Sequence, residues 1–218
     1  MNRRTKRIII IMCIIGVISV ISYNLYKYNI IPHTQYTDED FGIESYQSQA
    51  DCDDDGIDDQ TDLLQNVREY IATNPKYRSE YYDTGYPQGE YGVCTDVVGM
   101  GLLGAGYNLM ELVNQDMLEN MDSYPVDHID RCIDFRRVRN LDIYFQHHAI
   151  VLTTNLHEID QWHGGDIVVF DGHIGIVSDK RNHNGVPFLI HHASPYQINY
   201  EEDVLEQRDD IIGHYRIS

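Results

Sequence analysis

The chain has 218 residues, which is enough for one domain with a hydrophobic core and a tail but too few for two full domains. Its formal net charge is −19, and five of its sixteen basic residues precede residue 32, where no acidic residue occurs. The rest of the chain is therefore strongly acidic. Nucleic acid and anionic lipid need Lys and Arg for neutralisation, so we expect no nucleic-acid partner, whereas divalent cations are compatible with this charge.

The N-terminus places four basic residues before an apolar run from Ile8 to about Ile21, which trails off through interfacial tyrosines. Positive charge before an apolar segment predicts an inside-to-outside orientation. The run is short enough for a signal peptide, but no small-residue cleavage site follows it and the tyrosines extend it toward spanning length. We predict that residues 1–28 form an uncleaved signal anchor, with a cleaved signal peptide as the alternative. Either way, the domain is expected outside the cytoplasm.

Residues 29–50 are polar and aperiodic and are predicted to form a linker between the membrane and the domain. In the next segment, 51–62, acidic residues occupy positions 1, 3, 5, 9 and 12, with Gly56 at position 6. This is the spacing of an EF-hand-type calcium loop, in which alternate side chains converge on one hard cation and glycine permits the turn. The predicted ligand positions are Asp51, Asp53, Asp55, Ile57, Asp59 and Asp62.

Two features of this loop depart from the calcium pattern. Position 12 is Asp62 rather than the longer bidentate Glu, and the polar linker offers no incoming helix. The alternative is therefore a solvated acidic cap in front of the next helix.

Apolar spacing predicts helices at about 61–73, from Cys94 to about Gly106, and at 107–121. The segment 143–152 is expected to begin as a short helix and end as a strand. The pattern then changes to strands separated by turn residues, at 166–170, 173–178, 187–192 and 213–217. Helices followed by a strand meander predict an α+β fold.

Cys94 begins the second of these helices, after a stretch rich in turn-forming residues. A thiol in the first turn of a helix lies near unpaired backbone N–H groups and the positive end of the dipole, which favour thiolate and lower the thiol pKa. Gly99, Gly101 and Gly104 keep one side of this helix slim, so another element can pack closely. The alternative is a small buried core cysteine, because free cysteines are among the most buried residues.

Of the three other cysteines, Cys13 belongs to the apolar N-terminal segment. A disulfide between Cys52 and Cys132 would leave Cys94 free, as expected for a reactive thiol. Spacing alone does not decide whether this pair forms.

Cysteine hydrolases need an imidazole beside the thiol and a third polar group that orients the imidazole. The chain offers His173, which opens a strand, followed by His191 or His192. Neighbouring strand residues point to opposite faces, so only one of these two can face His173. The alternative is that each is an ordinary hydrogen-bonded histidine. The basic cluster at 133–141 is expected to pair with the domain's own acidic residues, with substrate anchoring as the alternative.

At these residues the sequence resembles the YijF-like bacterial family, a domain of unknown function grouped with the papain-like clan of NlpC-type cell-wall peptidases. The resemblance covers roughly residues 60–218. The motifs that carry it are GVCTDVV (92–98), IDFRRV (133–138), GDIV (165–168), HIGIVSD (173–179), EEDVL (201–205) and GHYR (213–216).

The resemblance implies a papain-like (NlpC-type) fold, in which a helix carrying the cysteine packs on an antiparallel sheet carrying the histidines. It places the nucleophile at Cys94, the base at His173 and the third polar residue at His191. His192 stands where the family has Asn. Phe135 stands where many relatives have His, so we assign it no role.

We therefore expect an extracytoplasmic, membrane-anchored cysteine hydrolase that cleaves an amide bond, with peptidoglycan stem peptides as the substrate class. No cofactor is expected for catalysis, and calcium would be structural. The alternative is a non-catalytic papain-like domain, stabilised by calcium, that binds a cell-wall or protein ligand. A zinc hydrolase is disfavoured because no HxxH or HxH pair with a nearby carboxylate occurs on one element.

Overall fold

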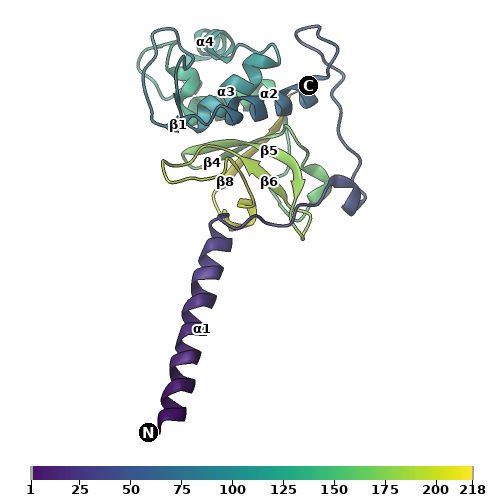
Figure 1. Ribbon diagram of the computed structural model, residues 1–218. Helices are drawn as coiled ribbons and strands as arrows, with labels where there is room; N and C mark the ends of the chain where they lie inside the picture. Colours follow the sequence, from purple (N-terminus) through teal and green to yellow (C-terminus); the bar gives the residue numbers. More distant parts are fainter. Residues whose placement is uncertain (1, 218) are drawn as a thin grey trace. The chain divides into compact units, whose positions relative to one another are not determined.

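The computed structural model describes residues 2–217, and the chain divides into two compact units. The first unit ends at Thr34 and contains the helix α1 (Arg3–Lys27). By length and composition, α1 is long and apolar enough to cross a membrane (Figure 1). Its place near the N-terminus fits a signal anchor or a signal peptide, as the sequence predicts.

The second unit begins at Gln35 and combines helices with an antiparallel sheet, so the predicted α+β class is confirmed. Its sheet has the strand order β3-β8-β4-β5-β6-β7, and every neighbouring pair is antiparallel. A separate short pair, β1 and β2, is parallel.

The helices of this unit are α2 (Asp59–Ala72), α3 (Cys94–Gly104), α4 (Leu109–Glu119) and α5 (Val138–His148). The strands are β1 (Lys76–Tyr77), β2 (Tyr91–Gly92), β3 (Ile150–Val151), β4 (Ile167–Phe170), β5 (His173–Arg181), β6 (Pro187–Ile190), β7 (Glu201–Glu202) and β8 (Ile211–Arg216). Short 3-10 turns lie at Asp38–Phe41, Met121–Ser123, Asp134–Arg136, Ile159–Gln161 and Leu205–Gln207.

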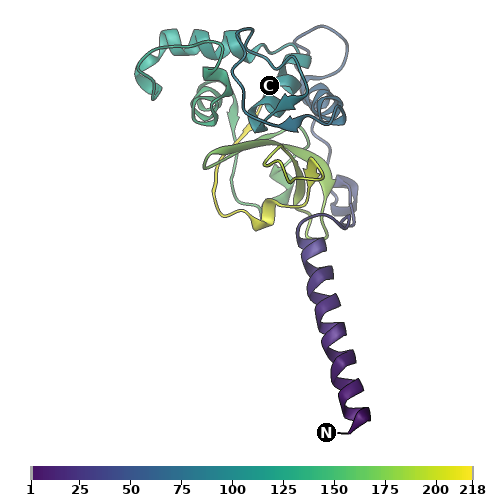
Figure 2. The same ribbon diagram turned by 60° about the vertical axis from the view of Figure 1, so that its left-hand side comes forward.

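The helices form a layer on one face of the sheet, with α3 packed between α2 and β5 (Figures 1 and 2). The slim side of α3 makes this possible, because a Cβ added at Gly101 would lie 2.2 Å from a methyl group of Val67. The main core lies between the layers, and a smaller core around Trp162 covers the other face of the sheet. All four residues of β4 are therefore buried, which explains its unbroken apolar sequence.

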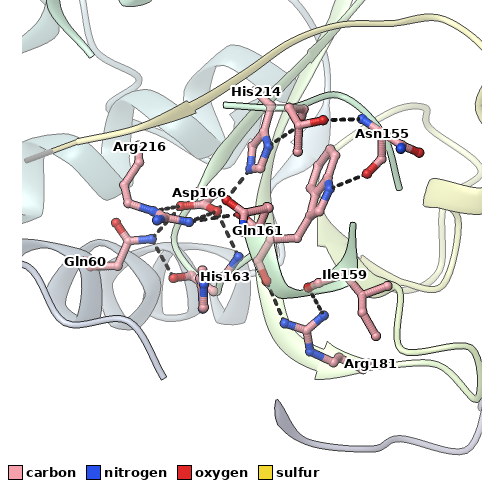
Figure 3. A network of polar contacts seen from close by, with 12 residues as sticks. Gln60, Asn155, Ile159, Gln161, His163, Asp166, Arg181, His214 and Arg216 are labelled. Atoms are coloured by element: carbon pink, nitrogen blue, oxygen red, sulfur yellow. Dashed lines mark hydrogen bonds and ion pairs between the residues drawn. The ribbon is translucent and has the colours of Figure 1, made fainter. Parts of the chain in front are cut away.

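A buried polar network joins the first turn of α2 to the start of β4 and the end of β8 (Figure 3). Asp166 accepts hydrogen bonds from Arg216 Nε at 2.7 Å, from Gln60 Nε2 at 2.9 Å and from His214 Nε2 at 3.0 Å. Burial alone would raise the pKa of Asp166, but Arg216 and His214 hold it below its usual value. The GDIV and GHYR motifs thus supply residues that tie the fold together.

The linker expected over 29–50 is shorter in the structure, because the chain joins the compact second unit from Gln35 onward. Tyr36 donates its N–H to the carbonyl of Arg181 at 2.9 Å, and the buried Arg181 side chain pairs with Asp38 at 2.5 Å. These contacts anchor the segment to the end of β5. The segment therefore packs against the domain through a backbone contact and the Asp38 side chain, while most of its other polar side chains are exposed.

The disulfide between Cys52 and Cys132 does not form, and each cysteine in the described part of the chain is a free thiol. Cys132 donates its thiol to the carbonyl of Asp83 at 3.3 Å, whereas Cys52 lies in the acidic loop. The spacing of the cysteines leaves this pairing open, and the structure does not contain it.

Candidate functional site

Cys94 is the first residue of α3, and a buried ion pair fixes the backbone before it. The residue before it, Val93, is extended, and its N–H donates to Asp96 Oδ2 at 2.9 Å. Asp96 in turn accepts from Arg136 Nε at 2.6 Å and Nη2 at 2.9 Å. Both side chains are almost fully buried, so this bidentate pair holds the start of the helix rigidly.

The Cys94 thiol is half-buried where α3 meets the start of β5. Burial raises the pKa of the thiol above its usual value, although backbone hydrogen bonds from Ile174 and Thr95 lower it. The lower pKa expected from the helix start is therefore wrong: desolvation outweighs the local dipole. The donor of this hydrogen bond, Ile174, follows His173 directly in β5.

His173 and His191 contact each other directly across neighbouring strands. His173 opens β5, His191 directly follows β6, and the Nε2 atom of His173 lies 2.9 Å from the Nδ1 atom of His191. His191 Nε2 then lies 3.1 Å from Glu202 Oε2 on β7. Three adjacent strands thus align two imidazoles and one carboxylate.

Glu202 is not among the site residues expected from the sequence, although the EEDVL motif contains it. Glu202 and His191 are buried, and Gln197 Nε2 also donates to the Glu202 carboxylate at 3.1 Å. The sequence gives no local signal for this contact, because it depends on the pairing of β6 with β7.

The carboxylate sets the tautomers of both imidazoles. An ionised Glu202 only accepts, so His191 carries its proton on Nε2 and presents Nδ1 as an acceptor. His173 must then donate from Nε2. This leaves the Nδ1 lone pair of His173, which has no hydrogen-bond partner among residues 2–217.

The His173 imidazole is neutral at pH 7. Burial, with a smaller contribution from the nearby His191 and Arg208, lowers its pKa to about 3. With the Cys94 thiol pKa raised, the thiol and the imidazole are both uncharged in the resting site.

His192 points away from this arrangement, which decides between the two candidate histidines. Its ring makes edge contacts with Tyr77 and Tyr200, with centroids 5.2 Å and 4.9 Å away. Its Nδ1 atom has no partner in the described structure. His191 is therefore the histidine that contacts His173, and the strand alternation expected from the sequence holds at this point.

The acidic loop brings together part of its predicted ligand set. Carboxylate oxygens of Asp51, Asp53 and Asp55 lie within 4.8 Å of one another. Asp51 accepts from the backbone N–H groups of Asp55 and Gly56, at 3.1 and 2.9 Å, and Gly56 has a φ of 91°. Such a turn favours glycine, as the loop pattern predicts.

Two of the other predicted ligands bind elsewhere. Asp59 accepts from the N–H of Cys52 at 2.7 Å and from the Tyr107 hydroxyl, and Asp62 accepts from Asn66 Nδ2 at 2.7 Å. Burial and the carboxylates of Asp55 and Asp53 raise the pKa of Asp62 to about 6. The carboxylates of Asp51, Asp53 and Asp55 thus fit a hard cation, whereas Asp59 and Asp62 are hydrogen-bonded to other groups.

The basic cluster pairs with acidic residues of the domain, as expected. Arg136 binds Asp96, and Arg137 lies 3.5 Å from Asp134. Phe135 is buried, and its ring packs against Tyr86 with centroids 4.7 Å apart, so it is part of the core.

The protein is of the α+β class, with a cysteine at the start of α3 and a hydrogen-bonded His–His–Glu line across β5, β6 and β7. The family model described as "Domain of unknown function (DUF1287)" matches residues 64–217, so the chain belongs to this family. A protein of Escherichia coli (strain K12), named "Uncharacterized protein YijF", is 35% identical over 167 residues, which cover 71% of this chain and 80% of the relative. No solved structure matches the chain.

Proposed function

We propose that the protein is a cysteine hydrolase that cleaves an amide bond, with Cys94 as nucleophile, His173 as base and His191 as the orienting residue. Two observations carry this proposal: the hydrogen-bonded line from Glu202 through His191 to His173, and the backbone hydrogen bond to Cys94 from Ile174, the residue after His173. The arrangement of α3 on the antiparallel sheet supports a papain-like fold of the NlpC type.

The mechanism begins from an uncharged thiol and imidazole. As Cys94 Sγ attacks the carbonyl carbon, Nδ1 of His173 takes the thiol proton, and the S–C bond forms while the carbonyl π electrons move to oxygen. His191, held by Glu202, stabilises the imidazolium that forms. His173 then gives the proton to the leaving amine as the C–N bond breaks, and water hydrolyses the thioester.

The backbone N–H of Cys94 supports the developing oxyanion in this proposal. Residues in the first turn of a helix have N–H groups without partners inside the helix. A donor of this kind, fixed before the reaction, typically contributes about 10²–10³ in rate. The Asp96–Arg136 pair keeps this turn in place.

The apolar N-terminal helix supports the location, and the resemblance to NlpC-type peptidases supports the substrate class. α1 would anchor the protein with its α+β unit outside the cytoplasm, where peptidoglycan stem peptides supply amide bonds. The acidic surface would repel anionic wall polymers, so a restricted role fits better than broad wall lysis. A structural calcium ion in the 51–62 loop would offset part of this charge.

One observation favours a second function, a non-catalytic domain that binds a wall or protein ligand. Burial raises the pKa of Cys94, which disfavours the thiolate that many cysteine enzymes hold ready. In that case the hydrogen-bonded line of His173, His191 and Glu202 would only stabilise the fold.

Digestion of purified peptidoglycan tests the hydrolase. The full-length wild type is compared with Cys94→Ala, and Cys132→Ala serves as a matched loss of a free thiol outside the site. The proposal expects new fragments from the wild type and from Cys132→Ala but none from Cys94→Ala, and their masses identify the bond. Identical products from all three proteins would contradict a Cys94-dependent wall hydrolase.

A further inference from the structure

A second polar cluster lies where α5 ends against α4, and it shares no residue with the cysteine site. His147 Nδ1 lies 2.8 Å from Asp116 Oδ2, and His148 Nε2 lies 2.8 Å from Asp116 Oδ1. One ligand atom from each of these three side chains lies within 4.8 Å of the other two. Two imidazole nitrogens and one carboxylate therefore converge on one point.

Asp116 is held in place by donors that are not metal ligands. Its side chain is 2% exposed, and it accepts from the Tyr124 hydroxyl and from Asn120 Nδ2 at 2.9 Å. Each carboxylate oxygen thus has one such donor and one histidine. Donors of this type fix the orientation of a ligating carboxylate and tune its affinity for a metal.

The histidines, in contrast, lie on the solvent side. The His147 and His148 side chains are 32% and 46% exposed, so an ion can reach the cluster from the surface. Their rings are inclined at 72° to each other. Crossed rings approach the carboxylate from two directions, as separate ligands of one ion do.

The donor set selects the kind of ion. Imidazole nitrogens suit zinc and its neighbours in the first transition row, whereas calcium and magnesium prefer oxygen ligands alone. Zinc sites with three protein ligands keep water in the fourth position. The neutral histidines would each present the lone pair of the nitrogen that now faces Asp116, with the proton on the other ring nitrogen.

We propose that Asp116, His147 and His148 bind one zinc ion, which joins the end of α5 to α4. The site is independent of the hydrolase proposal, because Cys94 and its partners lie on α3, β5, β6 and β7. Its expected effect is on stability, since an ion that binds only the folded chain stabilises it.

Titration of the chelator-treated full-length protein with zinc chloride in a calorimeter tests the proposal. The expected result is one zinc ion per chain, with a higher melting temperature, and no displacement by calcium or magnesium in excess. Cobalt in place of zinc should give the visible absorption of a low-coordinate nitrogen and oxygen site.

Variants locate the site. His148→Gln changes a half-exposed side chain and should abolish the binding of one zinc ion per chain. Its circular dichroism spectrum should remain that of the folded protein. Tyr124→Phe, which removes only a donor to Asp116, should weaken binding by about 10–100-fold. His157→Gln, an exposed histidine elsewhere, should bind as the wild type does.

Three results would overturn the proposal. The first is a wild type that takes up no zinc, and the second is unchanged binding in His148→Gln. The third is loss of binding in Cys94→Ala or in Asp53→Asn, which would assign the ion to the cysteine site or to the acidic loop.

Discussion

The Nε2 atom of His173 lies 2.9 Å from the Nδ1 atom of His191, and this contact leaves the other nitrogen of His173 free. The direction of the hydrogen bond depends on Glu202, because a carboxylate accepts a proton from His191 Nε2 and does not donate one. Glu202 thus determines the tautomer of the proposed base His173, which it contacts only through His191.

The first prediction concerns the tautomer of His173. Nitrogen NMR of ¹⁵N-histidine-labelled protein at pH 7 should show a neutral imidazole protonated at Nε2. Glu202→Leu removes the acceptor for His191 and should give mixed tautomers, whereas Glu202→Gln, whose amide oxygen still accepts, should retain the wild-type signal. A wild-type His173 protonated at Nδ1 would show that the proposed base is misassigned.

The second prediction concerns the ion pair at the start of α3. Arg136→Met leaves the Asp96 carboxylate buried and uncompensated, which should lower the free energy of unfolding by about 3–5 kcal/mol. Arg137→Met is the matched control: its side chain is 52% exposed, and its loss should cost less than about 1 kcal/mol. Urea unfolding of both variants measures the difference. Equal costs would mean that the buried pair does not hold the helix start.

The third prediction is a loss of stability in mild acid. The pKa of His173 is about 3 in the folded protein against 6.5 for the ordinary side chain, so between these values the unfolded chain binds the extra proton. Stability therefore rises with pH in this window and falls as the pH drops below 6.5. This one group should cost about 2 kcal/mol between pH 7.5 and pH 5.

Chemical unfolding at a series of pH values measures this dependence. His173→Gln, which does not titrate, should have a flatter profile between pH 7.5 and 5. A variant with the wild-type slope would show that other groups cause the loss.

The fourth prediction concerns calcium. If the 51–62 loop binds it with the affinity of an extracellular module, about 2 mM calcium should raise the melting temperature by about 2–5 °C relative to chelator. Asp53→Asn should abolish this rise, and Asp127→Asn, an exposed acid elsewhere, should not. A melting temperature that calcium leaves unchanged would make the loop an acidic cap.

Local patterns in the sequence predict the elements well. The apolar spacing of 107–121 corresponds to α4 (Leu109–Glu119), and the segment 143–152 does pass from the end of α5 into β3. These patterns succeed because each element buries one stripe or face of its own residues. Three of the four two-residue strands, β1, β2 and β7, show no such pattern, whereas β3 lies in the apolar stretch that follows α5.

The site itself depends on contacts between distant segments. Strand alternation predicts that one of His191 and His192 faces His173, but only the pairing of β5 with β6 shows that it is His191. The lowered pKa that the sequence predicts for Cys94 is wrong for a related reason. The helix start is a local feature, whereas the burial that outweighs it comes from packing against β5.

The cluster at Asp116 shows the same limit. A sequence search for metal ligands expects histidines and a carboxylate on one element, but the carboxylate here comes from α4 and the histidines from the last turn of α5. The convergence depends on the packing of the two helices.

The most direct test of the central claim is the alkylation of Cys94 by iodoacetamide at pH 7, followed by mass spectrometry of the peptides. Cys132, also a half-buried free thiol, is the internal control. Because burial raises the thiol pKa, the reactivity of Cys94 must come from proton transfer to His173. The account predicts that Cys94 reacts faster than Cys132 and that His173→Gln slows it by about 10². If Cys94 reacts no faster than Cys132, or if His173→Gln leaves the alkylation rate of Cys94 unchanged, Cys94 and His173 are not a nucleophile and its base.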